Sequence, residues 1–464
     1  MLRSGLASRQ DTEQGPVYVF KHALVQDTAY DSLLKTRRES LHAHIVQVLE
    51  SRYPDTVQRE PAMLARHAAA AGQLRAAIPY WRRASELAIH RLALHEATAH
   101  LQAGLNATAT LPAAPERDQV EMQLRASLGT VHMLGKGWAA PEVEQAYKRA
   151  NELARAADKV DEAIWPSWGV CVFHLVRGEI RQAQAMGRRM ATVARQSNSR
   201  HAWLVNNMMH VQLAFYSGQL AEVPVLCEQV EHGFNDPQDR KLIGLYSTDL
   251  KLVSMVHGLH AHWILGQVDD LDQAYAVIEQ RAIELEHPYS LAWARTWGIM
   301  AYLHAGELDR LLPRLQAGWH LADQHGFAYV SAMARFAMGW CRTQLGQVED
   351  GLVLMREGLA AFQATGAGIV LPFFLALLAE ALGQAGSHVE ALDCVAKART
   401  LTQQGGEHWH EAELHRIRGD LLTRGPQADL DEARACYERA AALATAHRAQ
   451  AWLKRAQQGL ASLG

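Results

Sequence analysis

The sequence predicts an all-α fold, a solenoid in which helix pairs stack side by side with a period of about 40 residues. Three observations predict it: a recurring tripeptide, an apolar stripe of helical spacing after each copy, and a composition of helix formers. The tripeptide is Gly, then Gln or Glu, then an apolar residue. Its glycines, separated by 40, 48, 40 and 40 residues, are Gly178, Gly218, Gly266, Gly306 and Gly346. Such periods are typical of arrays in which each helix pair packs only against its neighbours.

The apolar stripe follows every glycine, including an early copy at Gly72 and a degenerate copy at Gly386. Positions four and seven apart share one face of a helix, so a stripe of this spacing must pack against a neighbouring helix. Its members are Ala77, Trp81, Ala84, Ala183, Gly187, Met190, Val223, Cys227, Val230, Leu271, Tyr275, Ile278, Leu311, Leu315, Gly318, Gly351, Met355, Gly358, Ala391, Val395 and Ala398. We expect each glycine to end a first helix, because glycine tolerates the positive φ of such a turn.

Four parts are expected in chain order. A short strand at 17–20 and a basic amphipathic helix make up 1–50, first repeats occupy 58–112, and a longer solenoid occupies 115–446. A capping helix at 447–464 closes the array, which holds about ten helix pairs at this period. Eight extra residues between Gly218 and Gly266 predict a loop around 235–237. Because each pair leans only on the next, we expect an elongated curved array.

The stripe resembles the tetratricopeptide repeat, whose second helix carries Ala, a bulky residue four positions later and Ala three positions after that. The best matches are Ala77-Trp81-Ala84 and Ala433-Tyr437-Ala440. This resemblance implies a right-handed α-solenoid of tetratricopeptide-like helix pairs. The period of 40 residues is longer than the usual repeat of about 34 residues, which implies longer helices and a different superhelical pitch.

The N-terminal segment carries a second resemblance. Its residues match the segment that closes the ATPase module of large bacterial signalling proteins, in which an adenylate/guanylate cyclase-like domain precedes a STAND/AAA-type ATPase and a repeat tail. The matching residues are Phe20, His22, Leu24, Gln26, Asp27, Ala29, Tyr30, Leu33, Leu34, Arg37, Arg38 and His42. The resemblance implies that 1–50 is a winged-helix remnant of that module. It also implies that the chain is the sensor or regulatory tail of such a protein.

Charge and cysteine usage indicate the class of partner. The net charge of −3 offers no electrostatic footprint for nucleic acid or an anionic membrane, so we expect a protein or peptide ligand. An ATPase or cyclase module, in cis or in trans, is a further expected partner. Five cysteines without CxxC spacing, no membrane-spanning run and no targeting segment favour the cytoplasm.

Catalytic and cofactor motifs are not found. The chain has no GxxxxGK[ST], and the nearest fragment, 135–137, lacks its spacing and hydroxyl. His257, His260 and His262 do not converge on one helix face, and the acids that follow His408-Trp409-His410 suit a helix N-terminus. We therefore expect no catalytic site, no cofactor and no metal.

A row of aromatic residues is the candidate partner-binding groove. Counting back 13, 10, 6 and 3 residues from the repeat glycines gives Trp165, Trp168, Phe215, Trp263, Trp293, Phe336, Trp340 and Phe373. Two alternatives stay open. Partly exposed rings could bind a peptide or a helix, or the longer helices could turn the same rings into the core.

Three functions stay open as well. The sequence favours a non-catalytic protein-interaction scaffold. The second function is that of a subunit of a nucleotide-dependent signalling enzyme whose catalytic domains are encoded upstream. The third is a transcriptional regulator acting through the N-terminal remnant, which the balanced charge disfavours.

Overall fold

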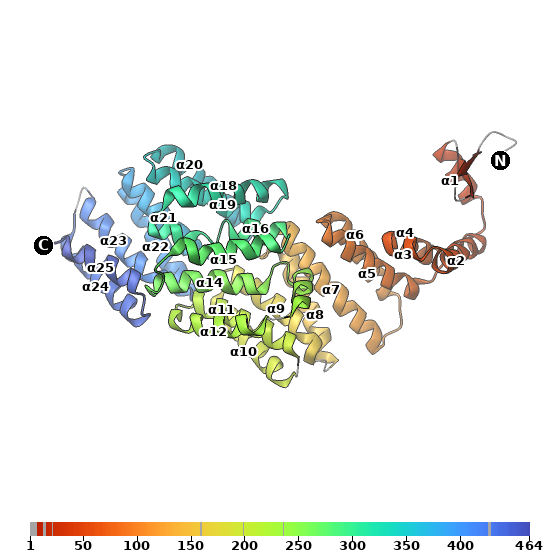
Figure 1. Ribbon diagram of the computed structural model, residues 1–464, viewed down its shortest axis with the longest axis horizontal. Coiled ribbons are helices and arrows are strands. Elements are labelled where there is room, and N and C mark those ends of the chain that lie inside the picture. The colour runs from red at the N-terminus through yellow and green to blue at the C-terminus, as the bar shows by residue number, and fades with distance from the viewer. Residues whose placement is uncertain are drawn as a thin grey trace. The chain divides into compact units, whose positions relative to one another are not determined.

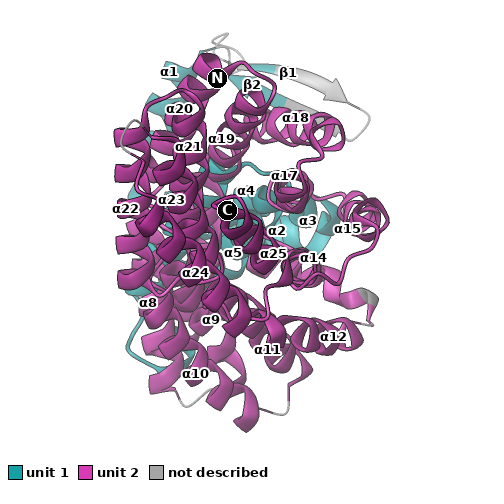
Figure 2. Cartoon of the chain, turned by 90° about the vertical axis from the view of Figure 1, so that its left-hand side faces the viewer, with its two compact units in different colours: residues 1–117 teal, residues 118–464 magenta. Residues whose placement is uncertain are grey.

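The computed structural model describes residues 7–12, 15–20, 22–157, 160–197, 199–234, 236–425 and 428–464. Asn235, in the predicted loop at 235–237, lies outside this part of the chain. The protein forms two compact units, residues 1–117 and 118–464 (Figure 1; Figure 2). Apart from one strand pair near the N-terminus, the regular structure of the described residues is helical, which confirms the all-α fold class.

Unit 1 begins with an antiparallel strand pair in which Ala7 pairs with Phe20. A core cluster of Val46, Ala65, Ala68, Ala77 and Trp81 holds its later helices together. Its elements are β1 (Ala7–Thr12), β2 (Gly15–Phe20), α1 (Ala23–Asp31), α2 (Lys35–Arg52), α3 (Pro54–Arg59), α4 (Pro61–Ala70), α5 (Leu74–His90) and α6 (Leu94–Ala109).

Unit 2 consists of helix pairs in sequence, and α25 follows the last pair. Its helices are α7 (Pro115–Lys136), α8 (Pro141–Ala156), α9 (Val160–Val176), α10 (Ile180–Gln196), α11 (Arg200–Tyr216), α12 (Val223–Gly233), α13 (Ile243–Tyr246), α14 (Leu250–Ile264), α15 (Leu271–Glu284), α16 (Pro288–Ala294), α17 (Met300–Ala305), α18 (Leu308–Gln324), α19 (Ala328–Gln344), α20 (Val348–Ala364), α21 (Leu371–Gln384), α22 (His388–Gly405), α23 (Glu411–Arg424), α24 (Leu430–Ala446) and α25 (Gln450–Ala461). Two 3₁₀ segments, Leu220–Glu222 and Pro237–Leu242, flank α12. α7 begins just before the unit boundary.

The recurring glycines end the first helices as predicted. All seven have positive φ, between 74° and 83°. After α19, for example, Gln347 N donates to Arg342 O at 3.0 Å, so the turn satisfies a carbonyl that the helix leaves open. A side chain with a β-carbon would be strained in this conformation, which explains why glycine recurs here.

The apolar stripe is buried along the second helices. Every stripe member is buried apart from Cys227, which is half-buried. The small members allow the backbones to approach closely: a β-carbon at Gly358 would lie 2.5 Å from Phe336 N. The stripe therefore packs each second helix against its partner, as the repeat pattern predicts.

Unit 2 does not stay an open curved array, because its early and late repeats bond to each other. Val176 O accepts hydrogen bonds from Gly368 N at 2.8 Å and from Ile369 N at 3.0 Å. Tyr216 O accepts one from His408 N at 2.8 Å, and α14 contacts α25. The expectation of an elongated array is thus wrong for this unit. Aromatic residues of early and late repeats also pack together, as the Phe215 and Trp409 rings do.

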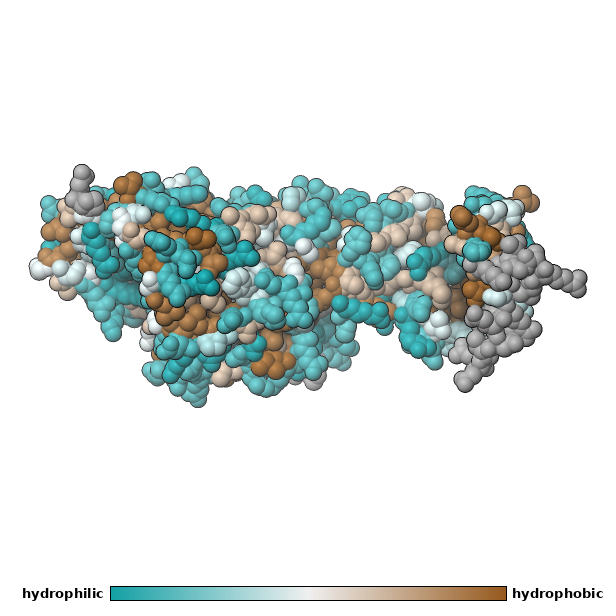
Figure 3. Space-filling view, turned by 90° about the horizontal axis from the view of Figure 1, so that it is seen from above, coloured by the Kyte–Doolittle hydropathy of each residue, from teal (hydrophilic) through white to brown (hydrophobic). Residues whose placement is uncertain are grey.

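The surface is of mixed polarity. In Figure 3, hydrophilic residues predominate on the face shown and hydrophobic residues form separate patches between them. No helix of the described residues is long and apolar enough to cross a membrane. The five cysteines are free thiols: Cys171, Cys341 and Cys436 are buried, and Cys227 and Cys394 are half-buried.

Candidate ligand-binding cleft

A cleft of about 550 Å³ opens in the C-terminal half of unit 2. Four successive first helices, α17, α19, α21 and α23, contribute its walls together with α25. First helices follow one another on one face of a repeat array, so residues of equal register lie in a row across them. The repeat pattern itself therefore places the polar residues of this cleft.

Two such rows line the cleft. The first contains His304, Gln344, Gln384 and Arg424, and the second contains Trp340, Glu380 and Asp420. Within each row the spacing is 40 residues. Gln344, Gln384 and Arg424 are exposed, whereas Trp340 is buried to 7% exposure. The first row is thus exposed from Gln344 to Arg424, whereas its first member, His304, is buried.

An ion-pair network forms the floor. The Arg416 guanidinium donates to Glu380 Oε1 at 2.6 Å, to Glu413 Oε1 at 3.0 Å and to Asp420 Oδ2. Arg455 donates to Glu413 Oε2 at 2.7 Å. Burial alone would raise the pKa of Glu413, but the two guanidiniums lower it to about 2. Burial opposes the charge of Arg416 as well, yet its carboxylate partners raise its pKa well above the usual value. Glu413 and Arg416 are therefore both charged at neutral pH.

Three residues of the cleft wall also carry ring nitrogens that are shielded from solvent. His304 Nε2, His410 Nδ1 and Trp340 Nε1 have no hydrogen-bond partner among the described residues. Both histidine side chains are more than nine-tenths buried, at 8% and 4% exposure. Burial lowers the pKa of His410 to about 3 and that of His304 well below its usual value, so both rings are neutral. A neutral imidazole offers one donor and one acceptor, and buried groups of this kind normally find partners.

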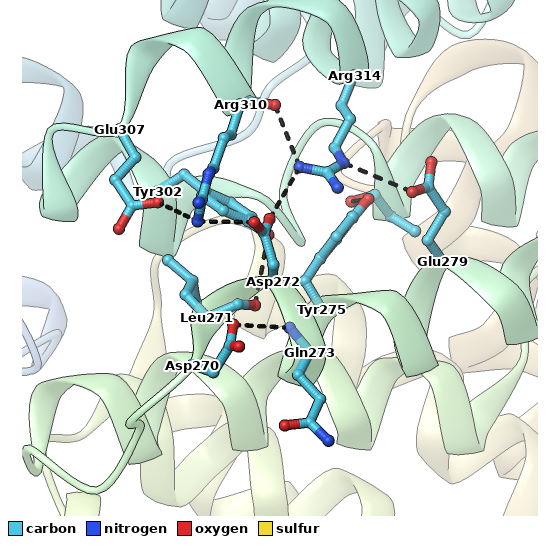
Figure 4. Close-up of polar contacts among 11 residues, drawn as sticks. Asp270, Leu271, Asp272, Gln273, Tyr275, Glu279, Tyr302, Glu307, Arg310 and Arg314 are labelled. Carbon is cyan, nitrogen blue, oxygen red and sulfur yellow. Dashed lines mark hydrogen bonds and ion pairs between the residues drawn. The ribbon is translucent and has the colours of Figure 1, made fainter.

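A second polar cluster lies on the neighbouring helices α15, α17 and α18 (Figure 4). Arg310 and Arg314 of α18 pair with Asp272 of α15 at 2.6 Å and 3.4 Å, and Tyr302 of α17 donates to the same carboxylate at 2.7 Å. The Arg314 guanidinium also lies 5.3 Å from the centre of the Tyr302 ring. Since Tyr302 precedes the cleft residues Leu303 and His304, this cluster fixes the position of α17.

The predicted aromatic row is divided between core and surface. Five members are buried, namely Trp168, Phe215, Phe336, Trp340 and Phe373, and three are half-buried, namely Trp165, Trp263 and Trp293. Contacts across the closed unit explain the burial: the Phe215 ring lies 5.1 Å from Trp409, and Trp263 lies 5.3 Å from Trp452. Trp340 lines the cleft, while Trp168 and Trp293 line a smaller aromatic pocket. Partner binding by this row stays a prediction.

The histidines considered as metal ligands make other contacts. His257 Nδ1 bonds to Val253 O at 2.8 Å, and its Nε2 lies 3.2 Å from Tyr216 Oη. His262 Nδ1 bonds to Gln267 at 2.9 Å, and His408 Nδ1 bonds to Glu411 at 2.8 Å. Within the described part of the chain, no three His, Cys, Asp or Glu side chains converge as metal ligands would.

Prediction from the sequence missed most of the cleft residues, although the register of the first helices relative to the repeat glycines was known. Counting back six residues from the repeat glycines finds Trp340, and the same count from Gly386 finds Glu380. Restricting that count to aromatic residues left Glu380 out. A count of two residues back would have found His304, Gln344 and Gln384. The signal that would have identified the cleft is a row of polar residues at one register, where packed helices usually carry apolar residues.

Comparisons with known proteins add a distant relative and a general fold likeness. No family model matches the chain. An uncharacterized protein of Rhizobium meliloti (strain 1021) is 22% identical over 481 residues, covering 100% of this chain and 45% of that protein. The chain thus spans less than half the length of the curated relative that it matches. The place of this chain in a signalling ATPase or cyclase-like protein stays a prediction.

Two solved structures show the general likeness. A Rap protein complexed with Competence and Sporulation Factor has a TM-score of 0.49 and 10% identity, covering 76% of this chain and 100% of that chain. The Cut9–Hcn1 hetero-tetramer of the APC/C has a TM-score of 0.36 and 12% identity, covering 94% of each chain. Likenesses this low identify neither a partner nor an activity for this chain.

Proposed function

We propose that the chain is a non-catalytic protein-interaction scaffold whose cleft at α17–α25 binds a segment of another protein. The observation that carries this proposal is the cleft of about 550 Å³ itself, whose wall carries polar side chains at equal register on successive first helices.

The exposed amides of the cleft suit a peptide backbone. Gln344 and Gln384 carry carboxamides at equal register on α19 and α21, the two helices in the middle of the row. A carboxamide donates and accepts at once, as a peptide group does, so it can bond to both the N–H and the C=O of an extended chain. Gly306, beside them in the cleft wall, leaves room for a backbone to approach, because nothing lies within 4 Å of an added β-carbon there.

We further propose that this scaffold is the regulatory tail of a cytoplasmic signalling protein and that its N-terminal segment contacts an ATPase or cyclase-like module. Large apolar side chains on this segment support the proposal: Leu24 is 80% exposed and Leu34 is 78% exposed. Helix α1 contains no buried residue among those described. Exposed apolar patches of this kind mark interaction surfaces. Ligand binding in the cleft would act on that module through different affinities for two states of the array.

The experiment is a selection on the immobilised full chain with a displayed library of random nonapeptides. Selected peptides should bind wild type and lose about tenfold in affinity when Gln344 and Gln384 are both changed to Ala, because each exposed carboxamide contributes about one hydrogen bond. Gln363→Ala is the matched control, since Gln363 is also exposed but lies on α20, outside the cleft. No enrichment of any peptide, or equal binding by all three proteins, would contradict the proposal.

A further inference from the structure

The charges at the floor of the cleft do not balance. Two guanidiniums, Arg416 and Arg455, face three carboxylates, Glu380, Glu413 and Asp420. The cluster of Figure 4 provides the comparison within the same unit. There Arg310 and Arg314, which Figure 4 shows, and Arg295 form ion pairs with Asp272, Glu279 and Glu307, so three guanidiniums meet three ion-paired carboxylates. Among the ion-paired groups at the floor of the cleft, the carboxylates thus outnumber the guanidiniums by one, while Arg424 lines the same cleft outside this network.

One carboxylate oxygen of this network accepts no hydrogen bond from the described residues. Five of the six carboxylate oxygens at the floor accept a bond: both of Glu413, both of Asp420 and Oε1 of Glu380. Tyr437 supplies the donor to Asp420 Oδ1, at 2.6 Å. The remaining atom is Glu380 Oε2, which has no donor among the described residues, and the Glu380 side chain is 27% exposed at the wall of the cleft. This oxygen is therefore open to a donor brought by a ligand.

Resting on the proposed function, we propose that the bound segment carries a basic side chain, Lys or Arg, which binds Glu380. The Glu380 side chain is partly buried, and a charged hydrogen bond there contributes more than it would on an open surface. Trp340 holds the same register on the preceding helix and contributes the small exposed part of its ring to the same wall. The ligand is thus an extended basic peptide.

The size of the cleft sets the length of this peptide. Neighbouring helices pack about 8–10 Å apart, so the row from α17 to α23 spans roughly 27 Å. An extended chain rises about 3.3 Å per residue, which gives about eight or nine residues. Glu380 lies on α21, the third of these four helices. The basic residue should therefore stand near the middle of the segment, with residues on both sides in contact with the exposed row.

An acidic ligand is the competing possibility. Arg424 also lines the cleft and has no ion-pair partner among the described residues. Its side chain is exposed, however, and ion pairs between exposed groups contribute little in water. The less exposed carboxylate at Glu380 is the stronger site, so the geometry favours a basic group. Changing Arg424 to a neutral residue should leave binding of a basic peptide unchanged or strengthen it.

The test uses the same nonapeptide selection with the full chain as wild type, Glu380→Gln and Arg424→Gln. Wild type should enrich Lys or Arg at one central position, and Glu380→Gln should lose that enrichment. In the peptide with the highest affinity, the basic residue is then replaced with Gln. This replacement should weaken binding to wild type about tenfold or more, and binding to Glu380→Gln less than about threefold. The second loss is smaller because the two changes remove the same contact. Glu279→Gln, in the cluster of Figure 4, is the control and should behave as wild type.

The outcomes separate this inference from the proposed function. Peptides that bind in the cleft without a basic residue, or an equal loss in wild type and Glu380→Gln, would overturn the inference and leave the scaffold standing. Enrichment of acidic peptides that Arg424→Gln abolishes would overturn it as well. No enrichment at all would contradict the scaffold and the inference together. Should Glu380→Gln fail to fold, the peptide change measured on wild type still decides, because an unchanged affinity there contradicts the proposal.

Discussion

At the residue scale, Glu407 shows how the closed unit uses a buried acid. Its carboxylate accepts hydrogen bonds from Val370 N at 3.0 Å and from Trp409 Nε1 at 2.8 Å. The next residue, His408, donates to Tyr216 O across the contact between early and late repeats. Burial raises the pKa of Glu407 to about 7, although its hydrogen bonds act in the opposite direction. Glu407 therefore titrates at the point where the unit closes.

This pKa predicts that the free energy of unfolding depends on pH. Comparison with Glu407→Gln separates the contribution of Glu407 from that of the buried histidines. The folded protein binds the Glu407 proton more tightly than the unfolded chain, whose carboxyl has a pKa near 4.5. The stability that Glu407 contributes is thus largest at low pH and falls as pH rises from about 4.5 to 7. Relative to Glu407→Gln, wild type should gain about 1–3 kcal/mol in the free energy of unfolding between pH 7 and pH 4.5.

Urea unfolding at several pH values measures this difference. Glu142→Gln is the control, because a hydrogen bond from Lys136 lowers the pKa of Glu142. Its contribution is lost only below about pH 4.5, so that comparison should stay flat over the same interval. A flat profile for Glu407→Gln would show that Glu407 is not held in the buried state described here.

At the element scale, the packing of α19 against α20 shows why small residues recur in the stripe. Gly339, Gly351 and Gly358 all lie on the contacting faces, where an added β-carbon would meet backbone atoms of the other helix at 2.7 Å or less. Backbone atoms cannot move aside as a flexible side chain can. The period and the stripe were readable from the sequence because each glycine and each apolar position serves a local packing need.

Gly358→Ala should therefore destabilise the protein, even though alanine favours helices. Overpacking of this kind costs about 1–3 kcal/mol, and here the clash is with Phe336 N at 2.5 Å. Gly244→Ala is the matched control, because nothing lies within 4 Å of an added β-carbon in the short helix α13. That change should be neutral or stabilise by up to about 1 kcal/mol. Urea unfolding of both variants checks the prediction, and equal effects would contradict the close packing of α19 and α20.

The break between α16 and α17 was not predictable from the repeat pattern. The first helix of the repeat before Gly306 is broken into α16 and α17, with turns over 295–299. Gly298 N reaches back to Trp293 O at 3.4 Å, five residues away, instead of making the regular helical bond. No proline marks the break, and the apolar pattern continues through it. The break depends on the packing of neighbouring helices, which the sequence of one repeat does not reveal.

At the scale of unit 2, the contact between early and late repeats decides which residues of the predicted aromatic row remain available to a partner. The aromatic row was predictable as a row, because its register repeats. Its burial was not, since closure depends on a superhelical pitch that accumulates small rotations over many repeats. The cleft lies where the inner face is not filled by the chain itself. Its polar rows at 40-residue spacing were in the sequence, but only the structure shows that they share one cavity.

Hydrogen–deuterium exchange of the full chain, with and without a selected basic nonapeptide, tests the central claim most directly. Bound peptide should slow amide exchange in α17, α19, α21, α23 and α25, the helices that line the cleft, and leave α10 and α12 unchanged. Slower exchange in all cleft helices would support the cleft as the binding site. Slower exchange confined to residues 22–109, or none at a saturating peptide concentration, would contradict it.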